Sequence, residues 1–138
     1  MITYTWQNDW SQDHITALYQ SVGWQAYLQD VAKTQRALRA STVLAAVADD
    51  GRLVGLIRGV SDGETILYIQ DLLVRPEFQG QHIGSTLIRQ FLANYQDVGQ
   101  IMLLSEAEPK TVAFYRSLGF SPVDPQSYGT ALVKDSRY

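Results

Sequence analysis

A glycine-bearing segment, Gln79 to Ser85, carries the clearest chemical signal in the sequence. It joins a nearly continuous apolar run, Ile66 to Val74, to an amphipathic stretch that begins at Ile83. Backbone N–H groups at the start of a helix lack an internal acceptor, and the helix dipole adds partial positive charge there. Gly80 and Gly84 allow a phosphate to approach the backbone closely. The segment predicts an anion site suited to a pyrophosphate, although an ordinary strand-loop-helix connection explains its composition equally well.

An acidic residue, Asp71, lies inside the apolar run. An unpaired carboxylate there would be costly, and burial would raise its pKa toward values useful for accepting a proton. Asp71 is therefore the first candidate for a general base, and Glu106, after the next predicted strand, is the reserve. The alternative is a structural carboxylate that accepts hydrogen bonds from a neighbouring loop. Gln70 can orient a substrate or a water but cannot act as a base at neutral pH.

Composition excludes several kinds of chemistry. The chain has no cysteine, so it offers no disulfide, no thiolate metal site and no cysteine acyl intermediate. His14 and His82 form no zinc pattern, so no metal is expected. The P-loop and dinucleotide-binding motifs are absent. A net charge of −3 without runs of Lys or Arg argues against a nucleic-acid partner and is compatible with a cationic amine substrate.

The location and size of the protein are predicted from the same composition. No apolar stretch approaches the ~20 residues of a membrane span, and no signal peptide precedes the first strand, so we expect a cytoplasmic protein without a membrane partner. The 138 residues, 46% hydrophobic and 18% charged, suit one domain over residues 1–138. Its oligomeric state stays open between a monomer and a homodimer.

The elements that position these residues follow from hydrophobic periodicity and turn signals. Strands are predicted at 2–6, 42–49, 53–60, 65–74 and 100–105, and helices at about 30–40, 83–95 and 111–118. A further helix is predicted to run through about Val22, with Asn8, Asp9, Ser11 and Asp13 as alternative N-caps. Asp50-Gly51 and Asp62-Gly63 are hairpin signals, so the middle strands should form an antiparallel meander. The strand-helix-strand passage that follows makes the last pair parallel. Thr111 is the expected N-cap of the last helix, and the tail is expected to resume as a strand near Phe120 with an irregular hairpin over 130–134.

Two stretches resemble a known family. Val74 to Ser85 is similar to the acetyl-CoA-binding signature of the GCN5-related N-acetyltransferase (GNAT) family, whose core pattern is Gln/Arg-x-x-Gly-x-Gly/Ala. Ala113 to Phe120 resembles that family's later helix and the strand after it, at about the expected distance. The two stretches and the residues between them cover about a third of the chain. One residue departs from the pattern, since His82 stands where the family usually has its middle glycine.

The resemblance implies an α/β fold with a mixed, largely antiparallel sheet flanked by helices and a central strand-loop-helix acetyl-CoA site. It implies an acyltransferase that moves an acetyl group from acetyl-CoA directly to a primary amine of a small molecule or a peptide. A non-catalytic acyl-CoA-binding module is the alternative.

The resemblance also assigns roles to residues. The main chain at Leu72, Leu73 and Val74 would pair with the pantetheine arm. The loop amides would hold the pyrophosphate, namely those of Gln79, Gly80, Gln81, His82, Ile83, Gly84 and Ser85. Trp24 and Tyr27, in the segment that commonly walls the acceptor pocket, and Gln70 are the substrate-binding candidates. Tyr115 would protonate the departing thiolate, although its spacing from Val112 and Leu118 is also that of a buried helix face.

Overall fold

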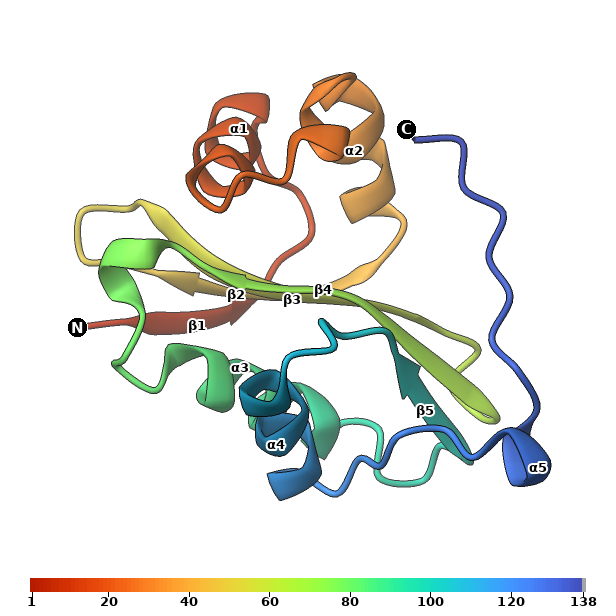
Figure 1. Cartoon of the computed structure of the whole chain (residues 1–138). Helices are drawn as coiled ribbons and strands as arrows, with labels where there is room; N and C mark the ends of the chain where they lie inside the picture. The colour runs from red at the N-terminus through yellow and green to blue at the C-terminus, as the bar shows by residue number, and fades with distance from the viewer. Residues whose placement is uncertain (138) are drawn as a thin grey trace. The chain divides into compact units, whose positions relative to one another are not determined.

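A five-stranded sheet organises the first of two compact units in the computed structural model, which describes residues 1–137. The first unit is Met1–Leu103 and the second begins at Leu104. The sheet order is β1-β2-β3-β4-β5, with bounds Thr3–Trp6, Thr42–Val47, Leu53–Ser61, Ile66–Val74 and Gln100–Leu103 (Figure 1). β1 to β4 pair antiparallel, and β4 pairs parallel to β5. The predicted mixed, largely antiparallel sheet is confirmed.

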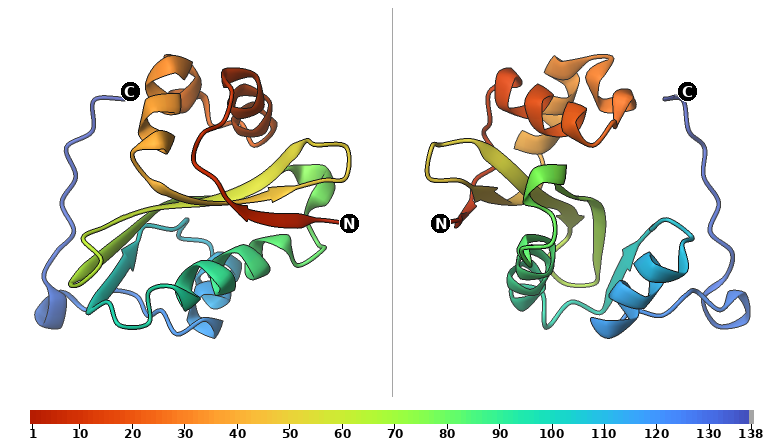
Figure 2. Two further views of the ribbon diagram at one scale, coloured as in Figure 1. Left: turned by 180° about the vertical axis from the view of Figure 1, so that it is seen from behind. Right: turned by 60° about the vertical axis from the view of Figure 1, so that its left-hand side comes forward.

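Helices of the first unit cover both faces of the sheet, so its middle strands are mostly apolar. α1 (Gln12–Ser21), the 3-10 turn η1 (Gln25–Leu28) and α2 (Val31–Arg39) lie on one face, and α3 (Ile83–Ala93) lies on the other (Figures 1 and 2). Continuous burial from Leu53 to Gly59 in β3 follows from this arrangement.

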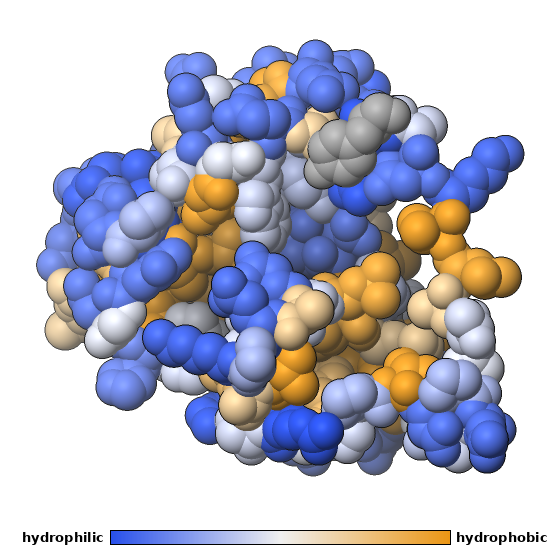
Figure 3. All heavy atoms as spheres, in the orientation of Figure 1, coloured by the Kyte–Doolittle hydropathy of each residue, from blue (hydrophilic) through white to orange (hydrophobic). Residues whose placement is uncertain are grey.

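The layer of α1 and α2 is fixed by caps, by its apolar stripe and by polar contacts. Ser11 accepts a hydrogen bond from the His14 backbone, and Asp30 accepts one from the Lys33 backbone, as helix N-caps do. The buried side chains of this layer are Ile15, Leu18, Tyr19 and Leu38, which pack with Leu53, Leu56 and Leu73 of the sheet. The outer surface of the two helices is mainly hydrophilic (Figure 3).

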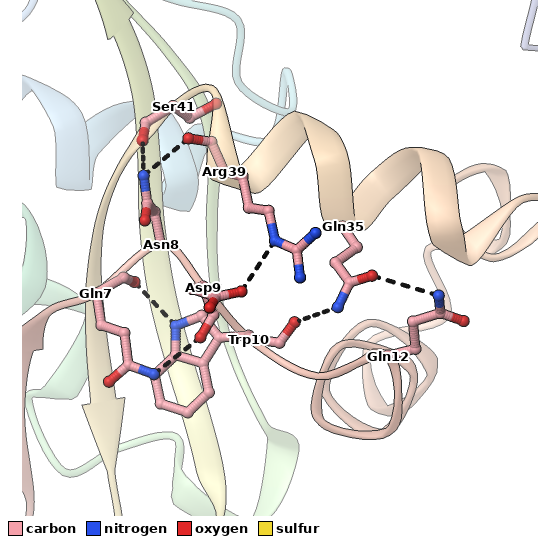
Figure 4. A network of polar contacts seen from close by, with 8 residues as sticks. All are labelled: Gln7, Asn8, Asp9, Trp10, Gln12, Gln35, Arg39 and Ser41. Carbon is pink, nitrogen blue, oxygen red and sulfur yellow. Dashed lines mark hydrogen bonds and ion pairs between the residues drawn. The ribbon is translucent and has the colours of Figure 1, made fainter.

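A polar network ties the β1–α1 connection to α2 (Figure 4). Arg39 Nε lies 2.9 Å from Asp9 Oδ1, and Gln35 Nε2 donates to the Trp10 carbonyl at 2.8 Å. Asn8 donates to the carbonyls of Arg39 and Ser41. These bonds satisfy backbone groups at the end of α2 and fix where β2 begins.

α3 approaches the sheet closely because β3 carries glycine beneath it. Ile83, Leu87, Ile88 and Phe91 are its buried side chains. A Cβ built on Gly59 would lie 3.0 Å from Phe91 Cζ, and one on Gly55 would lie 3.4 Å from Leu87 Cδ1. Any larger residue at Gly55 or Gly59 would therefore push α3 away from the strands.

The second unit corrects two expectations. α4 spans Pro109–Ser117 with Glu108 as N-cap, so Thr111 is not the cap; proline at the first helical position is already set in φ and loses no helical hydrogen bond. Among the described residues after Leu103 there is no strand, so the expected strand near Phe120 and the hairpin over 130–134 are wrong. Instead Asp124 caps the short helix α5 (Pro125–Tyr128). Gly119 ends α4 at φ 96°, as expected, and the single-domain assignment stays a prediction.

Candidate functional site

The connection between β4 and α3 contains two left-handed residues. β4 ends at Val74, the 3-10 turn η2 spans Pro76–Phe78, and the chain enters α3 at Ile83, where the sequence places the helix start. Gly80 has φ 82° and His82 has φ 63°. His82 is the only non-glycine residue with positive φ within residues 1–137. This left-handed conformation is strained for a residue with a Cβ atom, whereas glycine adopts it without strain.

Six backbone N–H groups of this connection are free to bind an anion. The first helical bond of α3 runs from the Thr86 N–H to the His82 carbonyl at 3.0 Å. The first three helical N–H groups, of Ile83, Gly84 and Ser85, therefore have no helical acceptor. Those of Gly80, Gln81 and His82 donate to no other residue in the described part of the chain. The Gln79 N–H is engaged by the Pro76 carbonyl at 3.2 Å, so Gln79 is not one of the amide donors.

The space and charge around these donors suit a phosphate. A Cβ on Gly80 would meet nothing within 4 Å, and one on Gly84 would meet only Val74 Cγ2, at 3.8 Å. No acidic residue occurs from Gln79 to Gln96. The dipole of the eleven-residue α3 directs partial positive charge to the same end. The residues present thus fit the pyrophosphate of a coenzyme A thioester.

An unpaired edge of β4 lies next to this connection in sequence. β5 pairs with β4 only from Ile66 to Ile69, and among residues 1–137 no strand pairs with that edge from Gln70 to Val74. The bond from the Arg75 N–H to the Val54 carbonyl, 2.8 Å, marks Gly55 and Val74 as a non-hydrogen-bonded pair of the β3–β4 ladder.

The alternation of this ladder decides which backbone groups face the unpaired edge. The N–H and C=O groups of Leu72 and Val74 point to it, whereas those of Leu73 point into the ladder with β3. The expected role of Leu73 in pairing an extended ligand is therefore wrong. The Val74 carbonyl already accepts from Gln79 Nε2 at 3.1 Å. The backbone N–H and C=O groups of Leu72 and the N–H group of Val74 therefore remain as the groups of this edge that can bind an extended ligand.

A β-bulge at Gln70 turns Asp71 toward α1 and η1. Arg58 of β3 is opposite Asp71 and Gly59 is opposite Ile69, so Gln70 has no partner in the ladder. Such an extra residue changes the face to which the following side chains point. Asp71 is consequently buried on the side of Tyr19 and Tyr27.

The Asp71 carboxylate, 2% exposed, is fully paired. Oδ2 accepts from Arg58 Nε at 2.7 Å and from the Tyr19 hydroxyl at 3.0 Å, while Oδ1 accepts from the Tyr27 hydroxyl at 2.6 Å. The carboxylate is paired with a cation because Arg58 lies directly across the ladder, and the role of Asp71 as general base stays a prediction. The contacts favour the structural alternative, with donors from α1 and η1.

Burial and the adjacent carboxylate change the acidity of both tyrosines. Burial raises the pKa of Tyr19 well above its ordinary value, and the charge of Asp71 raises it further. The pKa of Tyr27 is raised by the same two causes. Both hydroxyls therefore stay protonated at neutral pH and can only donate to Asp71.

Arg58 and Tyr19 are the residues of this network that sequence reasoning missed. A signal for Arg58 was present, since it is the single charged residue within the strand predicted at 53–60. Counting outward from a two-residue Asp62-Gly63 turn would pair Arg58 with Leu67. The observed register starts with Ser61 opposite Leu67, and this longer connection and the bulge bring Arg58 opposite Asp71. Tyr19 belongs to an apolar helix face, where its hydroxyl gave no signal.

The remaining candidates lie in both units. Trp24 and Tyr27, half-buried with ring centroids 6.1 Å apart, pack against the core of the first unit. Tyr115 and Glu106 belong to the second unit, where Tyr115 contacts Phe114 and Phe120 edge-on. Burial raises the pKa of Tyr115, and the charge of Glu106 adds to the effect. The catalytic roles of these residues stay predictions. No group of three possible metal ligands was found in residues 1–137.

Comparison with known proteins identifies the family. The sequence model of the acetyltransferase (GNAT) family matches residues 4–120. The chain belongs to the GNAT family. A GNAT acetyltransferase structure from Streptococcus pneumoniae is 36% identical with a TM-score of 0.81, and the match covers 100% of both chains. A GNAT structure from Xanthomonas campestris is 25% identical with a TM-score of 0.78 and covers 96% of this chain and 94% of the other.

Curated relatives of this GNAT chain are longer proteins. A soybean protein named histone acetyltransferase TAP1 is 32% identical over 81% of this chain and 52% of its own length. A rice protein named serotonin N-acetyltransferase 2, chloroplastic, is 32% identical over 69% of this chain and 49% of its own length. The GNAT chain thus spans about half of each. No helix within residues 1–137 has the length and apolarity to cross a membrane. Because a relative is named chloroplastic, the cytoplasmic location stays a prediction.

Proposed function

We propose that this GNAT chain is an acetyl-CoA-dependent N-acetyltransferase that moves the acetyl group directly to a primary amine of a small molecule or a peptide. The observation that carries the proposal is the set of six free amides at the start of α3, next to a β4 edge without a strand partner. Family membership supports the same reaction class.

Each part of the site has a task in this reaction. When bound, acetyl-CoA supplies a thioester carbonyl and a thiolate leaving group. The amides from Gly80 to Ser85 would hold the pyrophosphate, and the Leu72 groups and the Val74 N–H would hydrogen bond the amide-bearing pantetheine arm as a further strand does. These contacts use backbone atoms, so they position the ligand without a specific side chain.

For proton transfer, the resemblance of Ala113 to Phe120 to the family's later helix supports Tyr115 as the acid. The half-buried Tyr115 keeps its hydroxyl proton at neutral pH because its pKa is raised, so it can serve as the acid for a departing thiolate. Glu106, exposed in the loop before α4, is the remaining candidate base, since Asp71 is engaged by Arg58 and two tyrosines.

Thiol release from acetyl-CoA tests the proposal, with tryptamine, spermidine and a lysine-containing peptide as acceptors. The names of the rice and soybean relatives motivate the first and the last. Amine-dependent release is expected. Acetyl-CoA binding without amine-dependent release for any acceptor would favour a non-catalytic acyl-CoA-binding module.

The variant Tyr115→Phe tests the acid. It keeps the ring that contacts Phe114 and Phe120 and removes only the hydroxyl. Turnover at saturating amine should fall by roughly 10–1000-fold, around the usual effect of acid catalysis, while thermal stability changes little. Parental turnover with chemistry rate-limiting would reduce Tyr115 to a packing residue.

A further inference from the structure

The Asp71 network reaches the surface through Gln70. Gln70 is exposed, and its Nε2 donates to the Tyr27 hydroxyl at 3.0 Å. That hydroxyl donates to Asp71 at 2.6 Å, and Asp71 is held by Arg58. On the far side, Arg58 NH1 donates to Ser41 Oγ at 3.2 Å. A continuous hydrogen-bond chain therefore runs from a buried ion pair to an exposed amide.

The carboxylate sets the direction of every bond in this chain. An ionised carboxylate only accepts, so the single proton of the Tyr27 hydroxyl is committed to Asp71. The Tyr27 oxygen can then only accept from Gln70, which must present its NH₂ group to it. This orientation leaves Gln70 Oε1, the acceptor end of the amide, facing away from Tyr27. Arg58 Nε and the Tyr19 hydroxyl also donate to Asp71, so they secure the direction.

The position of Gln70 in β4 places its Oε1 atom where a ligand can bind. Gln70 is the bulge residue of β4, immediately after Ile69, where pairing with β5 ends. It precedes Leu72, whose backbone groups face the unpaired edge. Among the described residues no hydrogen bond is made by Gln70 Oε1. An amide oxygen held in one orientation at the start of an open edge is suited to accept an N–H from a ligand.

We propose that Gln70 Oε1 is a positioning acceptor for the N–H of the acceptor amine, held in place through Tyr27 by the Asp71–Arg58 pair. The inference rests on the proposed function and deepens it. Asp71 then acts as a positioning residue and takes no proton from the amine. This contact favours an amine that carries an N–H over a tertiary amine, because such a group can donate a hydrogen bond to Gln70 while its lone pair remains free to attack a carbonyl.

Steady-state kinetics at saturating acetyl-CoA test the inference with the fastest acceptor among tryptamine, spermidine and the lysine peptide. Gln70→Leu should raise the KM for the amine about 10-fold, the effect of one lost hydrogen bond, with kcat within about 3-fold. Gln90→Leu makes the same change on the exposed face of α3 and should leave the KM unaltered.

A double-mutant comparison of Tyr27 and Gln70 tests whether Tyr27 positions Gln70 or only packs beside it. Tyr27→Phe keeps its ring beside Tyr19 and Trp24 and removes the bond that orients Gln70. It should raise the amine KM by about the same factor, and the double variant Tyr27→Phe/Gln70→Leu should be no worse than either single variant. A parental KM for Gln70→Leu, or KM effects that multiply in the double variant, would overturn the inference while leaving the acetyltransferase activity established.

An NMR measurement that needs no enzymatic turnover tests the orientation of the Gln70 side-chain amide. In the parent, the side-chain NH₂ protons of Gln70 should show nuclear Overhauser contacts to the Tyr27 ring. Asp71→Asn introduces an amide that can donate to Tyr27, which frees the tyrosine proton for Gln70 Oε1 and should abolish those contacts. Absence of the contacts in the parent overturns the inference whether or not any amine turns over. Absence of turnover with the contacts present counts against the proposed function alone.

Discussion

Two regions, the loop between β4 and α3 and the bulge of β4 at Gln70, offer hydrogen-bonding groups of different kinds. The first uses backbone N–H groups of Gly80 to Ser85, which any residue except proline supplies. The second uses the side chains of Asp71, Arg58 and two tyrosines, each specific in length and charge. A substitution in the loop should therefore matter only if it changes the backbone conformation or adds charge. In the network, replacing any one of the side chains should remove a hydrogen bond.

The largest expected effect is on stability, from breaking the network at Arg58. Arg58→Ala leaves the buried Asp71 carboxylate without its cation, which should lower the free energy of unfolding by about 3–5 kcal/mol. Urea unfolding measures this loss. The double variant Arg58→Met/Asp71→Leu removes both charges but leaves the buried Tyr19 hydroxyl without its acceptor, so it should recover only part of the stability. A loss under about 1 kcal/mol for Arg58→Ala would mean that water reaches the carboxylate.

The loop should respond most strongly to charge at Gly84. Gly84→Glu places a carboxylate among the free amides, so the acetyl-CoA dissociation constant from calorimetry should rise by about 100-fold or more, while the unfolding midpoint changes little. Gly84→Ala is the matched control, because its Cβ would lie 3.8 Å from Val74 Cγ2 and carries no charge. Equal affinities for the two variants would exclude this loop as the phosphate site.

Alkaline pH should weaken the network while leaving the backbone of the loop intact. The pKa of Tyr19 is raised on folding by burial and by Asp71, so above pH ~10 the unfolded chain loses a proton that the folded chain keeps. Stability is therefore fully present below pH ~10 and falls as pH rises further, by up to about 1.4 kcal/mol per pH unit for this group.

The free energy of unfolding, measured from pH ~9 to ~11, should fall less steeply for Tyr19→Phe than for the parent. Tyr128→Phe changes an exposed tyrosine of α5 and serves as the control. Identical slopes for the parent and Tyr19→Phe would be inconsistent with a raised pKa at Tyr19.

The smallest expected effect is at His82. A left-handed non-glycine residue costs about 1–2 kcal/mol, and glycine loses about 0.5–1 kcal/mol more conformational freedom on folding, so His82→Gly should stabilise the protein by about 0.5–1 kcal/mol. His82→Ala keeps the strained Cβ and should bring no such gain. Acetyl-CoA affinity should stay within about 3-fold for His82→Gly, since the amide donors are unchanged; a larger change would assign the imidazole a direct role in binding.

The sequence predicts this fold where local signals and burial agree. The Asp50-Gly51 and Asp62-Gly63 turns and the apolar runs between them define β2 to β4, and the periodicity after the loop gives the start of α3 at Ile83. The glycine-bearing loop could be recognised for the same reason, because its chemistry is local to a few consecutive residues.

The errors occur where the outcome depends on contacts distant in sequence. The partners of Asp71 come from positions 13, 44 and 52 residues away, and the bulge at Gln70 has no local signature. In the tail, the apolar residues near 130 suggested a strand, yet Leu132 is 91% exposed in this structure. Periodicity alone cannot supply a pairing partner.

The two glycines of β3, Gly55 and Gly59, bear on which acyl-group donors would fit the proposed site. A pantetheine arm has a fixed length, so the β4 edge and the amides of α3 must lie a fixed distance apart to hold both of its ends. Gly55 and Gly59 set how deeply α3 sits against the strands. In the proposed complex, Gly55 and Gly59 would therefore set the distance between the two ends of the pantetheine arm, although neither residue belongs to those that would contact it.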